Sequence, residues 1–301
     1  MTRFCALLVI LLSYIHSAHS EVLNIDGSDS LAPFIRLNLP DWAAGNGGYP
    51  ISVSASGSST GIQKLTSGEV MIAPASREMT KAEYEQYFKQ QQHLPFFIKV
   101  AIDGVRIIVH HNNPIEGIKL TQLGQLYSST GGCKSETSIR NWSQMSDGYS
   151  GKVVPMSRGK QSGTFGLINK RILCGEPLLS SVMIHPDHHS TIKAVAKNPN
   201  AIGYISMNVQ SDAVKTLPIW SVVAKRYVYL DEATITYGYY PLARHLMVYA
   251  ALDETGKLPK RVKSLLEILL SESGQAKADM LGYTRLSKLT LEKQIEKLKM
   301  H

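Results

Sequence analysis

The sequence predicts an α/β fold with two domains, and three observations lead to this prediction. Short apolar strands alternate with helical patterns early in the chain, as they do in a largely parallel sheet. One β-rich run, 96–109, is long enough to pass from one domain into the next. The chain has 301 residues, which exceeds the usual size of a single hydrophobic core.

The strands are predicted from apolar and β-branched runs that stop at turn residues. They cover 22–25, 51–55, 70–73, 96–109, 152–155, 201–205 and 246–249. Helices are predicted over 32–42, from near Ile62, from a cap at Thr80, and over 120–127, 163–173, 261–270 and 273–281. We therefore expect a discontinuous first domain over 21–100 and 236–301, a second domain over 101–235, and a ligand cleft between them.

The charged C-terminal tail carries apolar residues at helical spacing, namely Leu291, Ile295 and Leu298. This spacing predicts a short helix that is either docked or frayed. A helix that binds a partner protein is the alternative.

The N-terminus, residues 1–20, has the pattern of a cleavable secretory signal peptide. Arg3 gives a short positive region, 5–15 is apolar, and small residues precede a cleavage position near Ser20. An uncleaved anchor is the alternative. Removing Arg3 with the signal lowers the formal net charge from +8 to +7. No run of five Lys or Arg residues occurs, so we expect no nucleic-acid partner, whereas a diffuse positive field suits a small anion.

Three turns share one pattern, because each follows a predicted strand, precedes a predicted helix and is rich in Ser, Thr and Gly. They are 27–30, 57–61 and 161–164. The first turn of a helix has unpaired N–H groups and a partial positive charge, so it attracts an anion. Arg158 lies four residues before Ser162 and could grip a tetrahedral oxyanion with two donors. The pattern indicates an anion site.

Other site chemistries lack their motifs. No Walker loop, GxSxG elbow or zinc spacing is present. His185, His188 and His189 could bind a metal, but three histidines in a polar stretch are more often only a loop. Ser162 would need a positioned base to act as a nucleophile, and the sequence identifies none. We expect no enzymatic activity, no metal and no cofactor; a secreted hydrolase is the least favoured class.

Two cysteines, Cys133 and Cys174, remain after the signal peptide. An even pair in an oxidising compartment predicts a disulfide, with two buried thiols as the alternative.

Eight stretches in matching order carry a family resemblance. They are 27–33, 56–79, 101–114, 120–129, 157–165, 198–205, 240–244 and 273–283. The chain resembles, over about 22–286, the phosphate-binding PstS-type periplasmic proteins of ABC transporters. These proteins have the type II periplasmic-binding-protein fold, in which two α/β domains are joined by two crossing strands. The resemblance implies hinges near Asp103–Gly104 and Tyr237–Gly238.

The resemblance also implies a function. It implies a periplasmic monomer that captures inorganic phosphate and delivers it to ABC permease subunits in the inner membrane. A binding or sensing module without a transport role, for phosphate or another oxyanion such as sulfate, is the alternative. The implied ligand-binding residues are Asp29, Ser30, Ser58, Ser59, Thr60, Arg77, Arg158, Ser162, Gly163 and Thr164.

Two positions depart from the family pattern. Well-studied members have an aspartate, which accepts the phosphate proton and excludes sulfate, where this chain has Arg77. They have a hydroxyl residue where this chain has Asp29. We hypothesise that Asp29 has taken the acceptor role, with Arg77 and Arg158 balancing the ligand charge. Asp29 as a simple helix N-cap is the alternative, and it would leave selectivity open.

Overall fold

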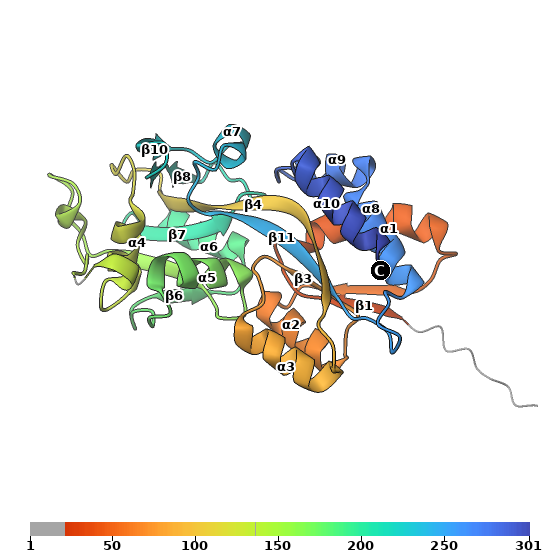
Figure 1. The fold of residues 1–301 in the computed structure, drawn as a ribbon. Coiled ribbons are helices and arrows are strands. Elements are labelled where there is room, and N and C mark those ends of the chain that lie inside the picture. The colour runs from red at the N-terminus through yellow and green to blue at the C-terminus, as the bar shows by residue number, and fades with distance from the viewer. Residues whose placement is uncertain (1–21, 136) are drawn as a thin grey trace, which may run out of the picture.

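The computed structural model describes residues 22–135 and 137–301 (Figure 1). The predicted signal peptide lies outside these residues. The described strands form a nine-stranded sheet in the order β2-β1-β3-β11-β4-β7-β5-β6, with β8 paired to β4, and a separate β9–β10 hairpin. The strands are β1 (Leu23–Asp26), β2 (Ile51–Ser54), β3 (Ile72–Ala75), β4 (Phe96–His110), β5 (Val154–Arg158), β6 (Met183–His185), β7 (Ala201–Ser206), β8 (Val214–Leu217), β9 (Ile219–Ser221), β10 (Arg226–Val228) and β11 (Ala243–Ala250).

Helices flank this sheet in two lobes, which Figure 1 shows on its right and left sides. The first lobe contains α1 (Ala32–Gly45), α2 (Ser58–Ser67), α3 (Lys81–Gln91), α8 (Lys260–Leu270), α9 (Glu272–Met280) and α10 (Lys288–Lys299). The second lobe contains α4 (Leu120–Tyr127), α5 (Gly163–Ile168), α6 (His188–Lys197) and α7 (Glu232–Thr236). The predicted two-domain α/β fold is therefore confirmed.

Two antiparallel strands, β4 and β11, join the lobes. The first part of β4 pairs with β11, from Phe96 opposite Ala250 to Gly104 opposite Ala243. From Val105 onward β4 instead pairs with β7 of the second lobe. A single strand thus contributes to both lobes, as the length of the β-rich run predicts.

Local sequence explains where the helices near the cleft begin. Gly57 has a φ of 104°, a left-handed conformation that favours glycine, and α2 starts immediately after it, earlier than predicted. Thr80 caps α3 as predicted, and Glu83 completes a capping box. The helix predicted over 163–173 is α5 followed by a π-helical segment, Asn169–Leu173.

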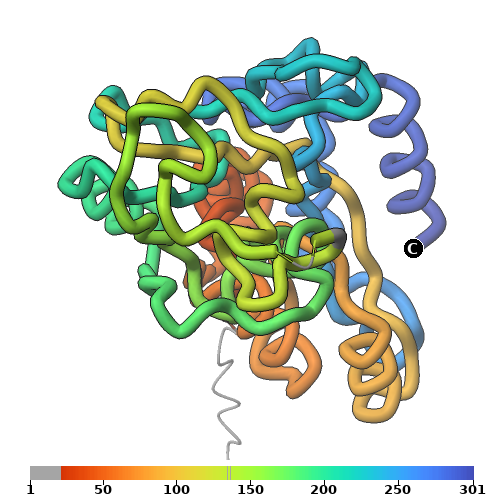
Figure 2. Tube along the Cα trace, turned by 90° about the vertical axis from the view of Figure 1, so that its left-hand side faces the viewer, coloured from red at the N-terminus to blue at the C-terminus, as the bar shows by residue number. Residues whose placement is uncertain are grey.

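The C-terminal helix α10 is docked, which decides between the alternatives for the tail. Figures 1 and 2 show it against the outside of the first lobe, next to α8. Leu298 is buried, and the Nζ atom of Lys297 donates to the carbonyl of Phe97 at 2.7 Å. The same amine lies 3.5 Å from the centre of the Phe97 ring, a cation–π contact.

The predicted disulfide between Cys133 and Cys174 is confirmed, with Cα atoms 5.0 Å apart. It ties the loop after α4 to the end of the π-helical segment, on the second lobe. Among residues 22–135 and 137–301, no helix is long and apolar enough to span a bilayer.

Candidate oxyanion-binding site

The three Ser- and Gly-rich turns meet at the cleft between the lobes. The amide of Gly57 donates to the carbonyl of Gly27 at 2.7 Å, which joins the first turn to the second. The amide of Ser59 donates to the carbonyl of Gln161 at 3.1 Å, which joins the second turn to the third across the cleft. Each turn ends a strand and begins a helix, so the helix N-termini converge here.

Buried hydroxyls from the first lobe face the N-terminus of α5 from the second. The Ser58 Oγ atom accepts a hydrogen bond from the Ser76 amide at 3.1 Å and lies 3.3 Å from the Ser76 Oγ atom. A Cβ atom at Gly163 would lie 2.4 Å and 2.2 Å from these two hydroxyl oxygens. Ser162 caps α5 by accepting from the amides of Thr164 and Phe165. These groups make a compact set of donors for one small anion.

Arg158 is buried between the lobes, and protein groups surround its guanidinium. Its side chain is 3% exposed, and Nη2 donates to the Asp29 Oδ2 atom and to the Pro186 carbonyl, both at 2.7 Å. Its Nη1 atom lies 3.2 Å from both ring nitrogens of His188. The Ser30 Oγ atom is 3.3 Å from the Nε2 atom of His188. The structure thus brings Asp29, Ser30 and Arg158 together around a buried histidine.

Asp29 is not the N-cap of α1. The cap position is Leu31, with no side-chain hydrogen bond, and the backbone amide that donates to Asp29 is that of the adjacent Ser30, at 2.9 Å. The helix-cap interpretation is therefore wrong. Burial acts to raise the pKa of Asp29, but the charge and hydrogen bond of Arg158 outweigh it and hold this pKa below its ordinary value. Asp29 is a carboxylate at neutral pH.

Arg77 forms an ion pair with Glu83. Its two Nη atoms donate to the two carboxylate oxygens of Glu83 at 2.7 and 2.6 Å, and Nη2 also donates to the Ser59 Oγ atom at 2.8 Å. Glu83 therefore neutralises the charge that we expected to face the ligand. Thr60 lies in the first turn of α2 and is half-buried.

The predicted ligand set leaves out four polar residues that are buried at the cleft: Ser76, Asp103, His188 and Arg244. Of these, the sequence had offered His188 as a candidate metal ligand and Asp103 as part of a predicted hinge. Arg244 donates to Asp103 through Nε and Nη2 at 2.9 and 2.6 Å, and its Nη2 atom reaches the Thr164 Oγ1 atom at 2.9 Å. Arg244 carried a signal for the site, because its charge interrupts an apolar stretch that leads into a strand. Within the described part of the chain, no group of three His, Cys, Asp or Glu residues is placed to hold a metal.

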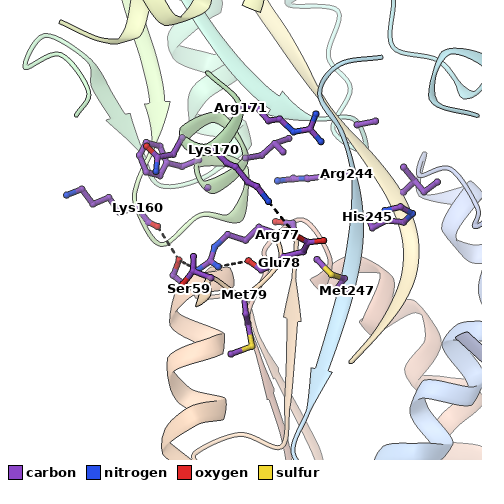
Figure 3. Close-up of a pocket in the computed structure, with 18 of the residues that line it drawn as sticks. Ser59, Arg77, Glu78, Met79, Lys160, Lys170, Arg171, Arg244, His245 and Met247 are labelled. Atoms are coloured by element: carbon purple, nitrogen blue, oxygen red, sulfur yellow. Dashed lines mark hydrogen bonds and ion pairs between the residues drawn. The ribbon is translucent and has the colours of Figure 1, made fainter. Parts of the chain in front are cut away.

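A cationic cavity of about 830 Å³ opens beside the buried groups. Figure 3 shows Lys170 and Arg171 of the second lobe facing Arg77 and Glu78 of the first across it. Six Lys or Arg residues and one Glu line this cavity, which also touches Ser59 and Ser76. Such a charge balance raises the local concentration of anions at the entrance.

The comparison with known proteins agrees with this geometry. The sequence profile of the PBP superfamily domain matches residues 13–293. The chain belongs to the PBP superfamily. Among its relatives in this superfamily is the phosphate-binding protein PstS of Pseudomonas aeruginosa, 29% identical over 94% of this chain and 88% of that protein. PstS of Staphylococcus epidermidis is 26% identical over 91% and 82%.

Solved structures show the same PBP-superfamily fold. A phosphate ABC transporter substrate-binding protein from Clostridium perfringens, solved with bound phosphate, superposes with a TM-score of 0.74 at 24% identity, covering 88% of this chain and all of that one. An ABC-type phosphate transport receptor from Vibrio cholerae gives 0.70 at 22% identity, with 88% and 100% covered. The resemblance stated from the sequence is therefore confirmed.

His188 gives this site a pH-dependent stability. Burial, followed by the positive charge of Arg158, lowers the pKa of His188 to about 3. Between its ordinary value of 6.5 and 3, the unfolded chain binds a proton that the folded chain does not. The free energy of unfolding should therefore fall as the pH drops through this window, by up to about 1.4 kcal/mol per pH unit.

His188→Gln should remove this part of the slope, because Gln does not titrate. Chemical denaturation between pH 7 and pH 4 measures it, with the exposed neighbour His189 as the site of the control variant His189→Gln. An unchanged slope in His188→Gln would contradict the assignment.

Proposed function

We propose that this protein is an exported binding protein that captures inorganic phosphate between its lobes for uptake by an ABC transporter. The observation that carries the proposal is that three Ser- and Gly-rich helix N-termini meet at the cleft, together with buried hydroxyls and an arginine, Arg158, that is paired with Asp29 of the first turn. The phosphate-binding names of the relatives support it. Candidate ligands of the phosphate are Ser30, Ser58, Arg158, Ser162, Gly163 and Thr164. Asp29 is the candidate acceptor of its proton, and Ser59 and Thr60 contribute the first turn of α2.

The proposal includes the two domains and their partners. The first domain comprises 21–100 and 236–301, and the second 101–235; the switch of β4 from β11 to β7 near Gly104 supports this division. The mature chain acts as a periplasmic monomer that meets permease subunits of the inner membrane. A module that senses an oxyanion without transport would share the site and differ only in its partner.

Charge pairing favours phosphate over sulfate. Arg158 is paired with Asp29, Arg77 with Glu83, and Arg244 with Asp103. Neutral donors must therefore hold most of the anion, and an acceptor is present for a proton on it. Asp29 supplies that acceptor as a carboxylate, whereas sulfate carries no proton and would place its oxygen against the carboxylate charge.

Hydrolysis is disfavoured by the acid–base properties of the site. Ser30 and His188 are in contact, as a nucleophile and a base would be. However, an imidazole with a pKa of about 3 is a very weak base at neutral pH. This supports binding without catalysis.

Isothermal titration of the phosphate-stripped protein with phosphate and sulfate tests the proposal. We expect tight phosphate binding and no sulfate binding. Asp29→Asn should shift the phosphate-to-sulfate affinity ratio toward sulfate by roughly 10- to 100-fold, because a charged hydrogen bond and a repulsion are both removed.

The matched control is Asp41→Asn, which changes an acid on α1 that pairs with Lys277 away from the cleft. It should leave the ratio unchanged. Equal binding of both anions by the wild type would reduce the proposal to a general oxyanion receptor, and binding of neither would refute it.

A further inference from the structure

We propose that Arg244 is a further ligand-binding residue, which contacts the anion through its Nη1 atom and couples it to the strands that join the lobes. This inference rests on the proposed function. Arg244 stands at the start of β11, and its side chain is only 4% exposed.

One nitrogen atom of the Arg244 guanidinium, Nη1, takes no part in the contacts with Asp103 and Thr164. The Nε and Nη2 atoms bind Asp103, and Nη2 also binds the Thr164 hydroxyl. Among the described residues, the buried Nη1 atom has no hydrogen-bond partner. A buried donor of a charged group without a partner is costly, so native proteins rarely keep one without a use.

The surroundings of Nη1 point to an anion. Arg244 binds the Thr164 hydroxyl, and Thr164 is next to Gly163, which approaches the buried Ser58 and Ser76 hydroxyls. The charge of Arg244 also contributes to the lowered pKa of His188, which places the guanidinium near the Arg158 cluster. Ser28 in the first turn has a hydroxyl that is likewise buried without a partner. The ligand class is a tetrahedral oxyanion that needs donors from several directions.

The same arginine links this site to both crossing strands. Arg244 lies opposite Asp103 in the β4–β11 register. The Oδ1 atom of Asp103 accepts from the Ser206 hydroxyl at 2.8 Å and from the Met207 amide at 3.2 Å, at the end of β7. Arg244 and Asp103 therefore connect β4, β11, β7 and α5. An anion on Nη1 favours the arrangement in which these elements are close, which is the closed form.

Arg244→Lys tests the inference, because lysine keeps the positive charge beside Asp103 but lacks the planar fork. We expect the dissociation constant for phosphate to rise roughly 10- to 100-fold. We also expect the phosphate-induced decrease in the radius of gyration, measured by small-angle scattering, to shrink. Arg106→Lys is the matched control, since Arg106 lies on β4 and its Nη1 atom donates to the Val209 carbonyl; it should behave as the wild type.

The outcomes separate this inference from the proposed function. Failure of the wild type to bind phosphate refutes the function. Wild-type affinity and closure in Arg244→Lys, even with a lowered melting temperature, refute only the role of Arg244. If the variant does not fold, a crystal structure of the wild type with phosphate decides. A phosphate oxygen within hydrogen-bond distance of Nη1 supports the inference, and any other partner for Nη1 overturns it.

Discussion

Replacing Arg158 with methionine should weaken phosphate binding by roughly 100-fold or more, because a guanidinium hydrogen bond to an anion is lost in a buried site. The same change leaves the carboxylate of Asp29 without its 2.7 Å partner. An unpaired charge at a buried position should lower the free energy of unfolding by about 3 kcal/mol. Titration calorimetry and urea denaturation measure the two effects.

Arg36→Met is the control for Arg158→Met. Arg36 is exposed on α1 and donates only to the carbonyl of Val53. Its replacement should change stability by less than about 0.5 kcal/mol and leave phosphate affinity intact. Arg158→Met with wild-type affinity would show that the anion binds elsewhere.

Gly163→Ala should weaken phosphate binding. The added Cβ would lie 2.2 Å from the Ser76 Oγ atom and 2.4 Å from the Ser58 Oγ atom, so the hydroxyls must turn away or α5 must withdraw. Either change removes donors from the site, and we expect phosphate affinity to fall roughly 100-fold. Alanine is the better helix former, but the overlap with two buried hydroxyl oxygens outweighs this gain, so the free energy of unfolding should also fall by about 1 kcal/mol or more.

The control for Gly163→Ala is Gly45→Ala at the end of α1, where a Cβ meets no atom within 4 Å. It should keep full affinity. Full affinity in Gly163→Ala as well would contradict the tight approach of α5 to Ser58 and Ser76 as the place of binding.

Local patterns predicted the parts of the molecule that depend on near neighbours. The three turns, the long strand β4 and the helix α10 follow from residue types that are close in sequence, whereas the docking of α10 does not. The capping box of Thr80 and Glu83 could also have been predicted, and with it a partner for Arg77 six residues earlier. In the structure Arg77 makes this local ion pair, and its contact with the ligand stays a prediction.

Pairings across the cleft could not be predicted in this way. Asp29 meets Arg158 across 129 positions, and Arg244 meets Asp103 across 141. Only the return of β11 beside β4 creates the second pair, and only the packing of the two lobes against each other creates the first. Short elements such as β6 and β9, with three residues each, carry too little periodicity to be identified alone.

A crystal structure with bound arsenate, a phosphate analogue that scatters anomalously, tests the central claim most directly. We predict one strong anomalous peak between the lobes, with its oxygens within hydrogen-bond distance of the Ser58 hydroxyl, the first amides of α5 and the Arg158 guanidinium. A peak in the cationic cavity that is out of hydrogen-bond reach of these three groups would contradict the account. The absence of any peak between the lobes would contradict it as well.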